Sequence, residues 1–209
     1  MPFSAFSYGT FKKIIGGFFM RKKMSLQALI ETAIMAGLAY VLDILPSFNP
    51  TPNISISFAM VPIFLLAFRW GMTAGFAGGF LWGLLQVITG DAYILTPLQG
   101  FIEYFVAFSC IGFAGVLKGA VQKSFREGNW KGRAWLLFAA VFIGSFARYF
   151  WHFIAGFIFW AEASSTLWGA IVYSFVINGM TMLGSALFCY IVLILVLGTA
   201  PRLLTQSVK

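Results

Sequence analysis

The stretch LWGAIVYSFVINGMTMLGSALFCYIVLILVL, residues 167–197, contains no charged side chain. A helix needs roughly 20 apolar residues to cross a bilayer, so this stretch is long enough to span a membrane. Five more apolar stretches precede it, at residues 26–45, 54–68, 71–88, 95–117 and 134–160. The sequence therefore predicts an all-α, polytopic membrane protein, a bundle of six transmembrane helices in the lipid bilayer.

The composition supports this fold class. The 209-residue chain is 60% hydrophobic and only 10% charged, whereas soluble domains are about a quarter charged. Six spans use most of the chain and leave no room for a soluble catalytic or nucleotide-binding domain. We expect a six-helix membrane domain over residues 24–209, preceded by a separate basic segment, residues 1–23.

The basic N-terminal segment has two interpretations. Its main cluster, Arg21-Lys22-Lys23, comes last, whereas a secretory signal places its charges before the apolar run. Residues 1–23 are either a basic amphipathic arm on the cytoplasmic membrane surface or an upstream extension of a chain that begins at Met24.

The basic residues fall on one side of the predicted membrane. Thirteen of the 14 Lys and Arg residues lie in the N-terminal segment, at Arg69, in the loop 118–133, or at Arg202 and Lys209. The loops on the other side carry Asp43, Asp91 and Glu162 and no basic residue. The positive-inside rule therefore predicts that the basic side, with both termini, is cytoplasmic. The same distribution explains the net charge of +8 as membrane topology, without a nucleic-acid partner.

Several chemistries have no counterpart in the sequence. There is no phosphate-binding loop for ATP hydrolysis, and the single histidine, His152, cannot form a multi-histidine metal site. Cys110 and Cys189 lie in apolar stretches without a metal-binding spacing. No Ser–His–Asp grouping suggests a hydrolase. We therefore expect neither an enzyme nor a bound cofactor, and intramembrane acids are too few for self-powered proton transport.

One helix face in residues 134–160 combines unusual residues. Arg148, the only basic residue away from the cytoplasmic side, is followed at four-residue spacing by His152, Gly156 and Trp160. Residues four apart share a helix face, and a glycine between two ring systems leaves room for a flat molecule. The alternative is helix packing at Gly156, a hydrogen-bonded core histidine and an interfacial tryptophan.

Glu103 lies about two turns into the fourth span from the outer side. An unpaired carboxylate at that depth costs a few kcal/mol, so it must face a cavity or a cation. A purely structural pair with Arg148 is one explanation. However, Tyr93, Tyr173 and Asn178 are expected at a similar depth. The set favours a pocket for a small, flat, polar molecule, for which a cationic or basic ring is well suited, over a simple interfacial belt.

Small residues indicate close helix packing in two places. Glycines recur through residues 71–88, which lets helix backbones approach one another. In the first span, Ala33 and Gly37 are four apart, beside the row Ala28, Thr32 and Ala36. That face serves either internal packing or the docking of a partner membrane protein.

Two stretches carry a family resemblance. YILTPLQGFIEY, residues 93–104, and RYFWHFIAGFIFW, residues 148–160, closely resemble the thiamine-specific substrate-binding subunit of energy-coupling-factor (ECF) transporters, the ThiT family. Residues 173–178 support them, and the resemblance extends over residues 24–197. It implies a six-helix bundle in the bacterial cytoplasmic membrane that captures thiamine from outside. It also implies partners for transport, namely a membrane coupling subunit and two cytoplasmic ATPases.

The resemblance also assigns residues. The ligand-contacting positions of the family correspond to Tyr93, Glu103, Tyr104, His152, Gly156, Trp160, Tyr173 and Asn178. Arg148 stands where the family can carry lysine, so the charge is kept. The first outer loop of the family can supply a tryptophan, whereas here it has Phe48. Ala33 and Gly37 match the docking surface for the coupling subunit. The alternatives are a binding subunit for another vitamin, such as riboflavin, and a self-sufficient secondary transporter or small membrane enzyme.

Overall fold

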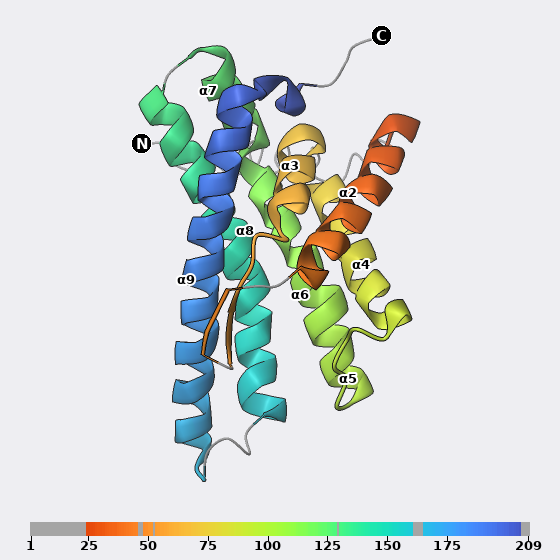
Figure 1. The fold of residues 1–209 in the computed structure, drawn as a ribbon, viewed down its shortest axis with the longest axis vertical. Helices are drawn as coiled ribbons and strands as arrows, with labels where there is room; N and C mark the ends of the chain where they lie inside the picture. The colour runs from red at the N-terminus through yellow and green to blue at the C-terminus, as the bar shows by residue number, and fades with distance from the viewer. Residues whose placement is uncertain (1–23, 46–47, 52, 129, 161–164, 206–209) are drawn as a thin grey trace, which may run out of the picture.

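The computed structural model describes residues 24–45, 48–51, 53–128, 130–160 and 165–205; residues 1–23, Glu162 and Lys209 lie outside these ranges. Apart from the short 3₁₀ helix η4 (Pro201–Leu204), the described residues form six helices when Pro97–Arg126 is counted as one (Figure 1). The others are α2 (Leu26–Ile44), α3 (Val61–Trp70), α4 (Met72–Thr89), α8 (Trp130–Phe159) and α9 (Leu167–Thr199). Five of the six, all except α3, are long and apolar enough to cross a membrane. The all-α, polytopic fold expected from the sequence is confirmed.

The second expected span differs from the prediction. Residues 54–68 are not one helix, because β1 (Phe48–Thr51) pairs antiparallel with β2 (Ile54–Ile56) and α3 begins only at Val61. Isoleucine and serine alternate from Ile54 to Ser57, which is the two-residue period of a strand. A prediction based on apolar content alone overlooked this alternation. The short α3 is buried along most of its length and lies inside the bundle.

The helix Pro97–Arg126 changes its winding along its length. It comprises α5 (Pro97–Gly100), the π-helical η1 (Phe101–Val106), α6 (Ala107–Cys110), the 3₁₀-helical η2 (Ile111–Leu117) and α7 (Lys118–Arg126). The Thr96 hydroxyl caps its start by accepting a hydrogen bond from the Gln99 amide at 3.2 Å. Short π-helical segments occur frequently at functional sites, and this one carries Glu103 and Tyr104.

Helix α4 packs backbone to backbone against η1 and α6. A Cβ added at Gly79 would lie 2.1 Å from the Phe108 carbonyl oxygen, and one at Gly83 would lie 1.8 Å from that of Tyr104. Only glycine allows this approach, so the close packing expected from the glycines of residues 71–88 is confirmed. The contact fixes η1 firmly against α4.

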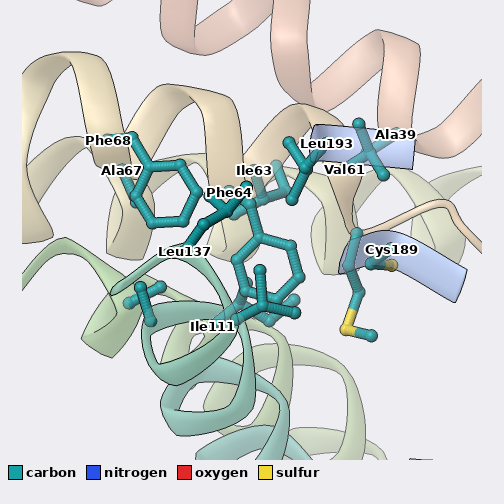
Figure 2. Packing of buried hydrophobic residues seen from close by; sticks show 14 of the residues in the cluster. Ala39, Val61, Ile63, Phe64, Ala67, Phe68, Ile111, Leu137, Cys189 and Leu193 are labelled. Carbon is teal, nitrogen blue, oxygen red and sulfur yellow. The ribbon is translucent and has the colours of Figure 1, made fainter. Parts of the chain in front are cut away.

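The apolar core surrounds α3. Figure 2 shows Phe64 and Phe68 of α3 packed among Ile111, Leu137 and Leu193 from the neighbouring helices. All five side chains are almost completely buried. Because α3 is apolar along nearly its whole length, it is buried inside the bundle, where it packs mainly against α2, α4 and η2.

A polar network ties the described chain ends together. Arg69 of α3 forms an ion pair with Glu31 of α2 at 2.6 Å and donates a hydrogen bond to the Leu203 carbonyl oxygen at 3.2 Å. Leu203 belongs to η4 (Pro201–Leu204), which follows α9. Figure 1 shows the start of α2 and the end of α9 at the same end of the bundle. That this end of the bundle faces the cytoplasm remains a prediction from the charge distribution.

Candidate functional site

A cavity of about 710 Å³ lies at the end of the bundle away from the start of α2. It is enclosed by the β1–β2 hairpin, the start of the helix Pro97–Arg126, α8 and α9. Of the eight ligand-contacting residues expected from the sequence and Arg148, seven line it, namely Tyr93, Glu103, His152, Gly156, Trp160, Tyr173 and Asn178. The remaining wall comes from Asn53, Leu95, Phe159, Ser174 and Ile177. The structure therefore brings most of the expected set around one space, whereas Tyr104 and Arg148 lie behind its wall.

The acidic side of the cavity is built around Gln99, which sequence reasoning missed. The Gln99 side chain is fully buried and connects the loop before α5 with η1. Its Oε1 accepts a hydrogen bond from the Leu95 amide at 2.9 Å, and its Nε2 donates to the Tyr93 carbonyl oxygen at 3.2 Å and to the Glu103 carboxylate. The four-residue spacing from Gln99 to Glu103 was the available signal. Gln99 thus orients the carboxylate on the cavity wall.

Glu103 also faces the residue that follows α8. The Trp160 side chain lies beside the carboxylate and lines the same cavity. Within the described ranges, Glu103 forms no ion pair with Arg148. The structural Glu103–Arg148 pair considered from the sequence is therefore absent there, and the carboxylate remains at the cavity.

The aromatic side of the cavity joins two elements. The rings of Tyr93 and Trp160 stack with centroids 5.5 Å apart and planes at 28°. The Tyr93 backbone amide donates a hydrogen bond to the Tyr104 hydroxyl at 2.8 Å. Tyr104 is therefore placed to position the loop that carries Tyr93, from behind the cavity wall.

Gly156 serves helix packing as well as lining the cavity. A Cβ added there would lie 2.2 Å from the Ser174 Oγ of α9. The Ser174 hydroxyl donates to the Phe153 carbonyl oxygen at 2.9 Å, and Asn178 Nδ2 donates to the Ser174 carbonyl oxygen at 3.0 Å. The space expected beside Gly156 is therefore partly occupied by Ser174, which sequence reasoning missed.

The hairpin reaches the cavity through Asn53. Its Nδ2 donates a hydrogen bond to the Tyr173 hydroxyl at 2.8 Å and so attaches the hairpin to α9, beside which it lies in Figure 1. Phe48 lies in the first outer loop, in which the family can supply a tryptophan; it is exposed and does not line the cavity. The first outer loop therefore contributes Asn53, which lies in the turn between β1 and β2, to the cavity wall.

A smaller cavity of about 240 Å³ adjoins the first and shares Asn53, His152, Ile177 and Asn178 with it. Arg148 lines this second cavity, as does Asp43 from the last turn of α2. Arg148 Nε donates a hydrogen bond to His152 Nε2 at 3.4 Å. Among the described residues, no group of three or more His, Cys, Asp or Glu side chains could hold a metal ion.

The small residues of α2 divide between two faces. Ala28, Thr32 and Ala36 are buried against the bundle, whereas Ala33 is exposed. A Cβ added at Gly37 would have no neighbour within 4 Å. Ala33 and Gly37 therefore present an open, small-residue surface in the described structure, and its use in docking remains a prediction.

The fold and the cavity define a multi-pass helical membrane protein with a polar and aromatic chamber at one end. The chain belongs to the family described as thiamine transporter protein, which matches residues 29–205. It is 40% identical to the thiamine transporter ThiT of Bacillus subtilis over 90% of this chain and 99% of that protein. It is 37% identical to thiamine transporter ThiT of Lacticaseibacillus paracasei over 88% of this chain and 93% of that protein.

A solved structure supports the same assignment. ThiT from Listeria monocytogenes superposes with a TM-score of 0.82 at 39% identity, covering 87% of this chain and 98% of that chain. The membership expected from residues 93–104 and 148–160 is confirmed. Because its relatives are transporters, the protein is a multi-pass membrane transporter and not an enzyme.

Proposed function

We propose that this chain captures thiamine at the outer face of the membrane with the cavity that Glu103 and Trp160 line. Thiamine carries a flat aminopyrimidine and a permanently cationic thiazolium. The observation that supports this ligand is the combination of one carboxylate and a stacked aromatic pair at a single cavity in a chain of this family.

Each wall of the cavity suits part of such a ligand. The Trp160 indole offers a face for ring stacking and for cation–π attraction. Glu103 balances the positive charge or accepts hydrogen bonds from the exocyclic amine. The hydrogen-bonding groups of His152, Tyr173 and Asn178 orient the ligand. Tyr104 holds the loop that carries Tyr93 through its hydroxyl. Arg148 lines the adjoining smaller cavity and orients His152 through its hydrogen bond.

We further propose that the chain is the substrate-binding subunit of an ECF-type importer. Its sequence holds no phosphate-binding loop, so ATP must be hydrolysed by other subunits. The open surface at Ala33 and Gly37 is suited to close approach by a helix of a membrane coupling subunit. Two cytoplasmic ATPases would complete the assembly.

Calorimetric titration of the detergent-solubilised protein with thiamine tests the proposed ligand. We expect saturable binding with one site per chain, and we expect riboflavin and other vitamins not to compete. Stronger binding of another vitamin would replace thiamine as the ligand.

Uptake into proteoliposomes tests the proposed partners. We expect no thiamine accumulation by this chain alone, and accumulation when the coupling subunit, both ATPases and ATP are present. Accumulation by the chain alone would instead identify a self-sufficient transporter.

A further inference from the structure

A partly buried cation, Arg148, lines the small cavity that adjoins the candidate site. The Arg148 guanidinium carbon is 4.2 Å from the ring centroid of Phe108 and 4.8 Å from that of Trp82. Its Nε donates to His152, which lines the main cavity. The guanidinium is therefore held in place by rings from two helices and connected to the cavity through one imidazole.

The opposing charge comes from a helix outside the expected site. Asp43, at the end of α2, lines the same small cavity as Arg148 and attracts it electrostatically. Gln86 of α4, which is only 7% exposed, donates a hydrogen bond from Nε2 to the Asp43 carboxylate. Three helices thus contribute one carboxylate, one amide and one guanidinium to a compact group.

This arrangement matters for a ligand that is itself a cation. A guanidinium next to the cavity would repel the positive ring, and such an interaction in a protein interior changes affinity by about tenfold or more. Asp43 and Arg148 form no direct ion pair among the described residues, but a carboxylate that lines the same small cavity opposes that field. Glu103 would then supply the net charge that the ligand meets.

We propose that Asp43, held by Gln86, neutralises Arg148 and thereby makes the cavity selective for a cationic over a neutral ligand. Asp43 is a specificity-determining residue that acts through Arg148 and need not touch the ligand. The inference rests on the proposed function, since it concerns how this same cavity receives thiamine.

The test compares two ligands of nearly the same shape. The affinities of thiamine and of an analogue with an uncharged ring in place of the thiazolium are measured for the wild type, Asp43→Asn, Arg148→Gln and the double variant. The ratio of the two affinities is the readout, because a merely structural defect weakens both ligands together. Glu127→Gln, an exposed carboxylate that lines neither cavity and lies beside Lys123, is the matched control.

The expected changes have opposite signs. Asp43→Asn lowers the preference for the cation by about tenfold or more, whereas Arg148→Gln raises it because the Asp43 charge is then no longer opposed by a cation. The double variant returns the preference to within about threefold of the wild type, and Glu127→Gln leaves it unchanged.

Either of two results overturns the inference. If Arg148→Gln leaves the preference unchanged or lowers it, the pair does not set the charge at the cavity. If Asp43→Asn weakens both ligands equally and the double variant recovers nothing, Asp43 is structural. The Arg148→Gln arm decides the question even where Asp43→Asn fails to fold. Absence of thiamine binding in the wild type would instead reject the proposed function, and this inference with it.

Discussion

The indole of Trp160 stacks on the phenol ring of Tyr93 at 5.5 Å between centroids. Trp160 directly follows α8, whereas Tyr93 lies in the loop before α5, so the contact closes one side of the cavity between two separate parts of the chain. A flat ligand in this cavity meets an aromatic wall that is already assembled.

Replacing Trp160 by alanine removes that wall. We expect the Trp160→Ala variant to bind thiamine about 10- to 100-fold more weakly, because stacking and cation–π contacts together contribute about 1–3 kcal/mol. Isothermal titration calorimetry measures the loss. Trp168→Ala is the control, since Trp168 of α9 is 73% exposed and lines neither cavity. Equal affinity in both variants would remove Trp160 from the site.

The Glu103→Gln variant keeps the size of the side chain and removes its charge. Hydrogen bonds to charged groups contribute about 1.5–3 kcal/mol, so we expect thiamine affinity to fall at least about tenfold. Competition with labelled thiamine measures the change. Glu127→Gln at the other end of the bundle, where the carboxylate is exposed beside Lys123, should bind normally. A Glu103→Gln variant with wild-type affinity would show that the carboxylate does not face the ligand.

The Gly156→Ala variant places a methyl group against Ser174 Oγ. Overpacking of this kind costs about 1–3 kcal/mol, so we expect a lower melting temperature and weaker binding. Adding Ser174→Ala should recover part of the melting temperature, because the obstructing oxygen is removed. Gly179→Ala on α9, where an added Cβ meets nothing within 4 Å, is the matched control. An unchanged melting temperature in Gly156→Ala would show that α8 and α9 do not pack this closely.

The Asn53→Ala variant removes the hydrogen bond that holds the hairpin to Tyr173. A neutral hydrogen bond contributes about 0.5–1.5 kcal/mol, so we expect bound thiamine to dissociate about 2- to 10-fold faster. Stopped-flow tryptophan fluorescence measures the dissociation rate. The exposed Phe48, changed to alanine, should leave the rate unchanged. Identical dissociation in the Asn53→Ala variant would indicate that the hairpin does not retain the ligand.

Much of this protein was predictable from its sequence. The long apolar stretches require helices, because lipid offers backbone groups no partners and they must bond within the segment. Four-residue spacing placed His152 and Gly156 on one face of α8, with Trp160 directly after it on the same side, since that period is fixed by the helix itself. Resemblance over residues 93–104 and 148–160 identified the family.

Only the tertiary structure decided which distant residues meet. Three contacts of the cavity depend on how helices and loops pack, which periodicity within one segment does not specify. They are the hydrogen bond from Gln99 to Glu103, the packing of Ser174 against Gly156, and the hydrogen bond from Asn53 to Tyr173. Asp43 illustrates the reason most clearly. By sequence it ends a helix near the outer face, and its importance arises because packing brings α2 to the same small cavity as the guanidinium of α8. A charge acts on whatever lies within a few ångströms, and folding alone sets those distances.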